Sequence, residues 1–152
     1  MNIKIGGLHK KEVVDLLQEH LDEMHIYSPA ESVHALDVSK LQTPDITFWS
    51  VWLNDELAGC GALKELSKTH AEIKSMRTSL NHQRKGVAEN LLIHILNESK
   101  NRSYKKVSLE TGTNDAFLPA QHLYKKYGFT SCEPFGNYSA DPFSTFMTKI
   151  LR

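Results

Sequence analysis

The sequence of 152 residues contains few cysteines, and this excludes several classes of protein. Its two cysteines, Cys60 and Cys132, have neither the spacing of a metal site nor the number needed for a disulfide framework. We therefore expect free thiols in a reducing cytoplasm, and no metal. Cys60 lies in an apolar run, which favours a core residue over a nucleophile.

Long hydrophobic runs and an excess of charge are also absent. The longest apolar run, 91–96, contains His94 and is far too short to span a bilayer, and residues 1–11 lack the apolar segment of a signal peptide. The 18 basic and 18 acidic residues cancel, so no long-range field attracts nucleic acid, although a local basic patch stays open. These absences favour a cytoplasmic protein with neither a membrane nor a nucleic-acid partner.

The remaining composition is that of an ordinary globular protein, with 40% hydrophobic and 24% charged residues, and the length suits one domain over 1–152. Hydrophobic periodicity alternates between strand and helix patterns along the chain. It predicts strands over 2–5, 47–53, 57–66, 71–79, 105–111, 129–132 and 144–151, and helices over 10–25, 86–100 and 119–127.

Three details of this pattern concern geometry. Gly59 and Gly61 lie inside a predicted strand, which suggests that another element approaches it closely. Strand, helix and strand over 71–111 predict a parallel crossover. In the strand over 71–79, simple alternation places Glu72, Lys74, Met76 and Thr78 on one face and Ile73, Ser75 and Arg77 on the other.

The stretch Gln83-Arg84-Lys85-Gly86-Val87-Ala88 joins a predicted strand to a predicted helix. The first N–H groups of a helix have no intrahelical partner, the helix dipole adds positive potential there, and Gly86 lets a phosphate approach the backbone. The stretch therefore predicts an anion site, with an ordinary helix N-terminus as the alternative. It is not a nucleotide P-loop, because Val87 follows Gly86, and it lacks the further glycines of a dinucleotide fingerprint.

The pattern Gln83-x-x-Gly86-x-Ala88 resembles the pyrophosphate loop of the GNAT superfamily of acyl-CoA-dependent N-acyltransferases. The segment Leu123-Tyr124-x-x-x-Gly128-Phe129, about 40 residues further on, resembles a second motif of that family. The resemblance implies the GNAT fold, an α/β fold with a mixed, mostly antiparallel central sheet of about six to seven strands and helices on both faces. Four segments resemble a bacterial subgroup of small-molecule acetyltransferases: Ser28-Pro29-x-Glu31-Ser32, 72–77, Glu110-Thr111-Gly112 and Pro134-Phe135-Gly136.

The resemblance implies an enzyme that transfers an acetyl group from acetyl-CoA to the amine of a small molecule by direct attack in a ternary complex. The expected enzyme is a monomer or a homodimer. A non-catalytic CoA-binding or sensing domain, and a protein or peptide N-acetyltransferase, stay as alternatives.

The resemblance also implies where acetyl-CoA binds. Loop amides would hold the pyrophosphate, and the strand before the loop would pair with the pantetheine amides and polarise the thioester carbonyl. Many relatives carry an asparagine seven residues before the motif tyrosine, where this chain has Phe117, so Asn114 is a candidate replacement. The expected contacts are Met76, Arg77, Thr78, Gln83, Arg84, Lys85, Gly86, Val87, Ala88, Asn114 and Phe117.

Acetyl transfer to an amine needs a proton donor for the leaving thiolate and a base for the ammonium. Tyr124 stands at the family's donor position, and a packed core tyrosine is the alternative. Glu72 is the first candidate for the base, and the alternative is that Glu72 is an ordinary solvent-exposed carboxylate on a strand. Glu110 and His25 are further candidates for the base.

The acceptor lining is expected from two polar segments and a few strand residues. Ser28 before Pro29 and Glu31 also fits the capped start of a short connector helix. Arg77 could clamp a carboxylate on the acceptor or pair with a neighbouring glutamate. The expected lining is His25, Ser28, Glu31, Ser32, Arg77, Glu110 and Tyr138.

Overall fold

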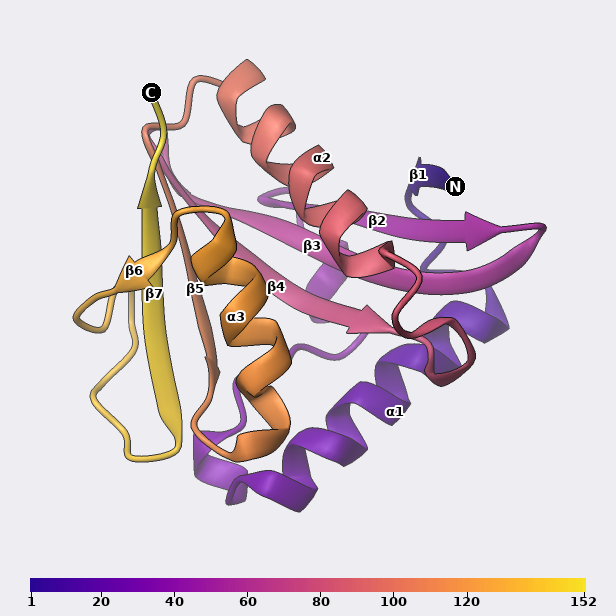
Figure 1. Ribbon diagram of the computed structural model, residues 1–152, viewed down its shortest axis with the longest axis horizontal. Coiled ribbons are helices and arrows are strands. Elements are labelled where there is room, and N and C mark those ends of the chain that lie inside the picture. The colour runs from indigo at the N-terminus through magenta and orange to yellow at the C-terminus, as the bar shows by residue number, and fades with distance from the viewer.

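A computed structural model describes all 152 residues, and a seven-stranded sheet of order β1-β2-β3-β4-β5-β7-β6 forms its centre (Figure 1). All neighbouring strands are antiparallel except β4 and β5, which are parallel, so the predicted mixed sheet and crossover are confirmed. The strands are β1 (Asn2–Ile5), β2 (Ile46–Leu53), β3 (Glu56–Ser67), β4 (His70–Thr78), β5 (Lys106–Gly112), β6 (Thr130–Ser131) and β7 (Ser144–Ile150). The helices are α1 (Lys11–Tyr27), α2 (Val87–Asn101) and α3 (Leu118–Lys126), with 3-10 turns η1 (Ala30–Ser32), η2 (Lys40–Gln42), η3 (Leu80–His82) and η4 (Asp115–Phe117).

Helices cover both faces of the sheet, as expected. Helices α2 and α3 lie on the face toward the viewer in Figure 1, and their apolar stripes bury a core that includes Leu91, Ile95 and Tyr124. Helix α1 covers the opposite face through a smaller core that includes Val13 and Leu17. No helix is long and apolar enough to cross a membrane.

Two glycines let β3 lie close to its neighbours. A Cβ on Gly59 would stand 2.8 Å from both the Arg77 carbonyl and the Val87 side chain, and one on Gly61 would stand 2.5 Å from the Met76 sulfur. The prediction that another element approaches β3 is therefore confirmed, and the neighbours are α2 and β4.

A bulge in β4 changes which face its residues occupy. The register with β3 shifts between the pairs Lys74–Ala62 and Arg77–Cys60, and Ser75 in the shifted segment has a positive φ of 56°. An extra residue in one strand reverses the alternation beyond it. Met76 therefore packs with Ile73 toward α2, and Arg77 reaches α1 on the face of Lys74, so the predicted simple alternation is wrong after Lys74.

Strands β4 and β5 separate at their carboxyl ends, as Figure 1 shows. Only His70–Ile73 pairs with Lys106–Leu109, after which β4 follows β3 and β5 follows β7. A parallel pair that parts in this way opens a gap in the sheet where ligands of α/β proteins commonly bind.

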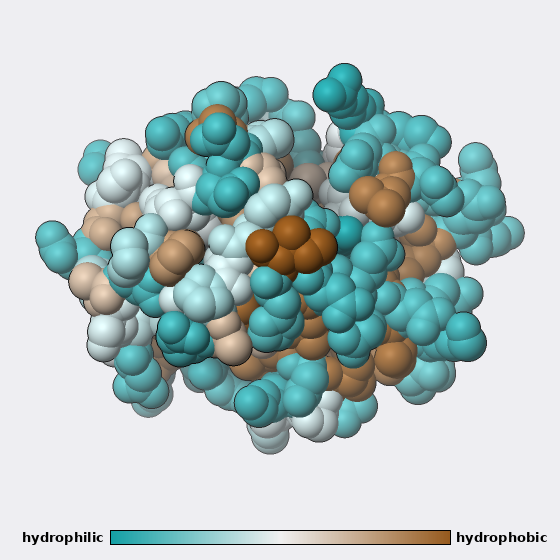
Figure 2. Space-filling model, turned by 90° about the horizontal axis from the view of Figure 1, so that it is seen from below, coloured by the Kyte–Doolittle hydropathy of each residue, from teal (hydrophilic) through white to brown (hydrophobic).

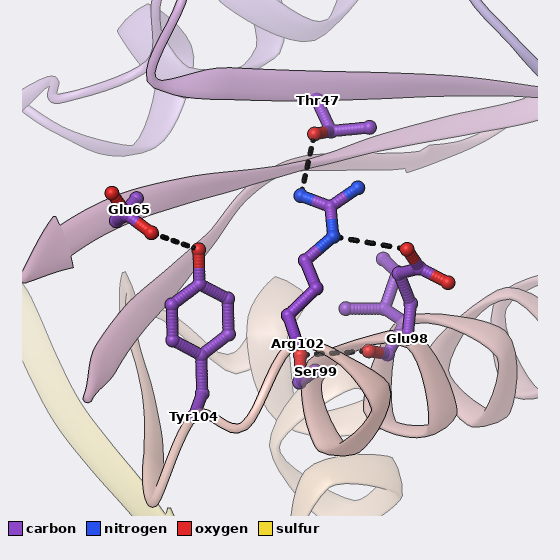
Figure 3. Close-up of polar contacts among 7 residues, drawn as sticks. Thr47, Glu65, Glu98, Ser99, Arg102 and Tyr104 are labelled. Atoms are coloured by element: carbon purple, nitrogen blue, oxygen red, sulfur yellow. Dashed lines mark hydrogen bonds and ion pairs between the residues drawn. The ribbon is translucent and has the colours of Figure 1, made fainter. Parts of the chain in front are cut away.

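Polar contacts fix the far end of α2 to the sheet (Figure 3). Arg102 donates to Glu98 in its own helix at 2.9 Å and to the Thr47 hydroxyl on β2 at 2.8 Å. Tyr104, just beyond the helix, donates to Glu65 on β3 at 2.6 Å. These contacts hold α2 on the sheet at the end remote from the gap.

The segment after α1 differs from the predicted connector helix. Helix α1 continues to Tyr27, and the Ser28 N–H bonds the Met24 carbonyl, so Ser28 ends one helix instead of starting another. Pro29 precedes a single 3-10 turn without a side-chain cap. Figure 2 views the molecule from below Figure 1, and the surface on that side is mainly hydrophilic, with hydrophobic residues in separated patches.

Candidate functional site

A cavity of about 510 Å³ occupies the gap between β4 and β5. Its wall includes Leu91 and Tyr124 from the α2–α3 face and Glu23 and Met24 from α1 on the other face. The cavity therefore passes through the sheet, and its volume is in the range of small-molecule sites.

One end of the cavity is the N-terminus of α2. Gly86 precedes the helix with φ +79°, and the first helical hydrogen bond runs from the Asn90 N–H to the Gly86 carbonyl at 3.0 Å. The amides of Val87, Ala88 and Glu89 therefore have no backbone acceptor. Free donors at the positive end of a 15-residue helix are the features that attract an anion, so this end keeps the predicted anion site as a candidate.

The loop residues before α2 divide between the cavity and the surface. Gln83, Arg84 and Gly86 line the cavity, together with Val87 and Ala88. Lys85 is exposed and does not line it. Glu89, in the first turn of α2, also lines the cavity, and Lys126 pairs with it at 2.8 Å and lowers the pKa of that carboxyl.

Beyond the bulge, β4 borders the cavity with backbone that β5 does not pair. Met76, Arg77 and Thr78 all line it, as expected. The Arg77 guanidinium is held by two carboxylates of α1, by Glu19 at 3.0 Å and by Glu23. This is the pairing with neighbouring glutamates that the sequence left open, so the guanidinium is not free for an acceptor carboxylate.

Tyr124 projects from α3 into the cavity wall. Its ring packs edge-on against Phe129 with centroids 5.6 Å apart, and the side chain is buried. Burial alone raises the pKa of its phenol, with no hydrogen-bonding partner to offset it. The phenol therefore stays protonated at neutral pH and can serve as a proton donor.

Glu72 on β4 is a buried carboxylate with two partners. The Tyr138 hydroxyl donates to its Oε2, and Lys74 Nζ lies 3.1 Å from the same oxygen. Lys74 also donates to the Tyr138 oxygen at 2.8 Å. Burial and the neighbouring Glu72 raise the pKa of the Tyr138 phenol, so the phenol remains the donor. Glu72 is thus buried and paired, which excludes the alternative of a solvated strand carboxylate.

Glu110 on β5 lies beyond the point where the strands separate. It shares the sheet face of Glu72 and Lys74, lines the cavity and forms no salt bridge. Burial raises the pKa of this carboxyl to about 7, Glu72 and Asp141 add to the increase, and Ser144 and Lys74 oppose it. A carboxyl that changes charge near neutral pH suits proton transfer.

The cavity brings together most of the predicted acceptor residues. Ser28, Ser32, Arg77, Glu110 and Tyr138 line it, whereas His25 and Glu31 are exposed and lie outside its wall. His25 is therefore not placed to act as a base. Residues that the sequence reasoning missed are His20, Glu23, Met24, His34 and Lys74.

A helical pattern could have identified three of the missed residues. His20, Glu23 and Met24 are three and four residues apart, so they share one face of α1. Burial and the nearby Arg77 lower the pKa of His20 to about 4, which leaves this imidazole neutral at pH 7. Lys74 gave no such signal, because strand alternation alone did not show which face borders the gap.

Phe117 and Asn114 have separate positions at the start of α3. Phe117 lines the cavity and packs so tightly on Gly112 that a Cβ there would stand 2.3 Å from the ring. The Asn114 side chain accepts from the Ala116 N–H at 2.9 Å and lies outside the cavity wall. Its oxygen is used to cap η4.

Two loops form a roof over the α1 side of the cavity. Ser32 donates to Asp141 at 2.6 Å, and the Tyr138 ring meets the His34 ring edge-on with centroids 4.9 Å apart. The hydrogen bond and the ring contact join the segment after α1 to the loop before β7. The contacts of Tyr138 with Glu72 and Lys74 fix the same loop to β4. We call residues 28–35 and 133–143 the roof.

Replacing Tyr138 with phenylalanine is expected to loosen the roof. A hydrogen bond to a charged group contributes about 1.5–3 kcal/mol, so the melting temperature should fall by about 3–10 °C. Differential scanning calorimetry measures this, with Tyr27→Phe as the control because the Tyr27 ring packs on Phe117 and its hydroxyl bonds no other side chain. An unchanged melting temperature would show that the contact contributes nothing.

Comparison with known proteins gives a consistent result. Residues 13–129 match the family model described as "Acetyltransferase (GNAT) family". The Uncharacterized N-acetyltransferase YsnE of Bacillus subtilis (strain 168) is 57% identical over 99% of this chain and 100% of that protein. The Uncharacterized N-acetyltransferase YedL of Escherichia coli (strain K12) is 48% identical over 98% of this chain and 94% of that protein.

A solved structure shares the fold. A GNAT family acetyltransferase from Elizabethkingia anophelis, crystallised with acetyl-CoA bound, superimposes with a TM-score of 0.72 at 20% identity. The match covers 99% of this chain and 97% of that one. The fold expected from the sequence is therefore confirmed.

Proposed function

The chain belongs to the GNAT family of acetyltransferases, and we propose that it transfers an acetyl group from acetyl-CoA to the amine of a small molecule. One observation carries the proposal. A single cavity crosses the sheet between β4 and β5, with the anion site at the start of α2 on one side and a polar part under the roof on the other. We call this polar part, which is lined by Ser32, Glu72, Lys74, Arg77, Glu110 and Tyr138, the chamber. Donor and acceptor can then meet from opposite faces without a covalent enzyme intermediate.

The residues at the α2 end fit the pyrophosphate of CoA. The free amides of Val87, Ala88 and Glu89 supply aligned donors, and Gly86 leaves their approach open. Arg84 adds a positive charge at the cavity edge. When bound, acetyl-CoA supplies the activated acetyl group.

The unpaired edge of β4 suits the pantetheine arm. Its backbone beyond Ile73 has no β5 partner, so an extended amide chain can add along it as a strand would. An N–H of this segment, beside the Ser75 bulge, would polarise the thioester carbonyl. Tyr124 on the α3 side would give its proton to sulfur as the carbon–sulfur bond breaks.

The roof favours a small-molecule acceptor rather than a protein acceptor. Residues 28–35 and 133–143 are tied together by Ser32, Asp141, Tyr138 and His34, so the chamber is covered where a peptide groove would be open. A non-catalytic CoA sensor remains the competing function, and it would need the anion site but neither Tyr124 nor the chamber.

An acceptor screen tests the proposal. Wild-type protein with acetyl-CoA and a pool of small amines is expected to yield at least one acetylated amine and an equal amount of free CoA, measured by mass spectrometry and thiol titration. Protein without acetyl-CoA is the control for background acetylation. Binding of acetyl-CoA without any acetylated product would favour the sensor.

A further inference from the structure

The two carboxylates of the chamber, Glu72 and Glu110, are in different states, and this difference assigns their roles. Glu72 accepts from Tyr138 and pairs with Lys74 through the same oxygen, so its negative charge is already compensated by a cation of its own strand. Glu110 has no ion-pair partner and lines the cavity beyond the end of β4–β5 pairing. Of these two carboxylates, Glu110 is therefore the one whose charge no cation of the protein compensates, and an incoming ammonium would be its partner.

The position of Glu110 also suits the direction of attack. Leu109 beside it packs into the core under α2 and α3, so Glu110 points to the opposite face of the sheet. Tyr124 belongs to that same α2–α3 core. The proton donor for sulfur and a base for the ammonium thus lie on opposite sides of the gap, which suits an amine that enters from the α1 face.

The charges of the chamber select against a carboxylate on the acceptor. Its cations are already neutralised, Lys74 by Glu72 and Arg77 by Glu19 and Glu23. Desolvation lowers the pKa of His20 to about 4 and also lowers that of His34, so neither imidazole adds a positive charge at pH 7. A substrate carboxylate would meet unpaired negative charge, whereas an ammonium would be attracted.

We propose that Glu110 receives the acceptor ammonium and takes its proton, that Glu72 anchors the roof through Tyr138 and Lys74, and that the acceptor carries no carboxylate next to its amine. The inference rests on the proposed acetyl transfer. It differs from the expectation of a carboxylate-bearing acceptor held by Arg77.

The proton balance is complete with groups on the chain. The ammonium gives one proton to Glu110, and the neutral nitrogen forms a bond to the thioester carbon. The carbon–sulfur bond then breaks as sulfur takes the Tyr124 proton, and the nitrogen loses a second proton that restores the phenol. Glu110 releases the first proton to solvent, so the products are the amide, the thiol and one proton.

Two substitutions separate the carboxylates by their pH profiles. In the wild type, kcat/KM should rise with pH through a value near 7, because Glu110 must be ionised. Glu110→Gln should lower kcat at pH 7 by about 10²–10⁴-fold and remove this rise. Glu72→Gln should keep the rise and change mainly the melting temperature. If Glu72→Gln removes the rise and Glu110→Gln keeps it, the assignment is reversed and the proposal fails.

A binding control separates this inference from the proposed function. Acetyl-CoA should raise the melting temperature of wild type and Glu110→Gln equally, since Glu110 lies away from the anion site. If wild type does not bind acetyl-CoA, the proposed function fails. If it binds and transfers acetyl but Glu110→Gln keeps the wild-type profile, only the role of Glu110 fails.

A stability measurement does not depend on turnover. The pKa of Glu110 is raised from 4.5 to about 7 in the folded protein, so folding binds a proton between these values. The wild type should therefore lose stability relative to Glu110→Gln as the pH rises from about 5 to 8. A constant difference between the two proteins would contradict a half-buried carboxyl without an ion-pair partner. If the variant does not fold, NMR titration of labelled wild-type glutamates should show one carboxyl with a midpoint near 7, and its absence overturns the inference.

Matched amines test the substrate class. Phenethylamine and phenylalanine, and propylamine and 2-aminobutyrate, differ only by a carboxylate next to the amine. We expect the amine of each pair to be acetylated at least tenfold faster at pH 8. Faster acetylation of the amino acids, or no acetylation of either amine, overturns the substrate class.

Discussion

Tyr124→Phe is expected to lower turnover by about 10²–10⁴-fold, because a positioned acid contributes about that factor and the substitution removes only the hydroxyl. The ring and its edge-on packing against Phe129 are kept. Since no protein group bonds the hydroxyl, acetyl-CoA affinity and melting temperature should change little. A single-turnover measurement reports the chemical step directly, because slow product release can hide it in steady state.

Tyr104→Phe is the matched control. Tyr104 is also buried, but its hydroxyl bonds Glu65 at the far end of α2, remote from the cavity. This variant should lose stability and keep its single-turnover rate. If Tyr124→Phe also keeps the wild-type rate, Tyr124 is a packing residue and the donor lies elsewhere.

Gly86→Glu is expected to abolish stabilisation by acetyl-CoA. At a ligand concentration about 100 times the dissociation constant, the wild type should gain about 2.7 kcal/mol. A glutamate here would place a negative charge at the free amides of α2 and strain a backbone with φ +79°.

Gly86→Gln separates charge from strain, because it has the same size and backbone cost without the charge. We expect Gly86→Gln to weaken the effect of acetyl-CoA and Gly86→Glu to remove it, by calorimetry of each protein with and without ligand. Equal losses in both variants would mean that space alone matters. Full stabilisation of Gly86→Glu would contradict the anion site.

Local sequence signals were sufficient for the framework of this protein. Helix and strand periods predicted every main element, and the glycine before α2 marked a helix start with free amides, which needs no distant partner. Gly59 and Gly61 indicated the close neighbours of β3 for an equally local reason.

The bulge at Ser75 was beyond such signals. Serine is not a residue type that marks a positive φ, and the alternation of side chains along a strand holds only where no residue is inserted. The face assigned to Met76 and Arg77 was therefore reversed.

The proposed acceptor chamber also depends on contacts between distant segments. Ser32 bonds Asp141 over 109 residues, and Tyr138 bonds Glu72 over 66. The sequence predicted these polar segments as a lining, but it could not show that Arg77 is already paired, that Glu72 is bonded to the roof, or that Glu110 has no ion-pair partner.

The central claim is that acetyl-CoA and an amine meet in one cavity that crosses the sheet. Initial rates measured over a matrix of acetyl-CoA and amine concentrations test it most directly, with the amine found by the screen. The account predicts lines that intersect in double-reciprocal plots, because both substrates must be bound before acetyl moves. Parallel lines, together with an acetylated protein after incubation with acetyl-CoA alone, would contradict it.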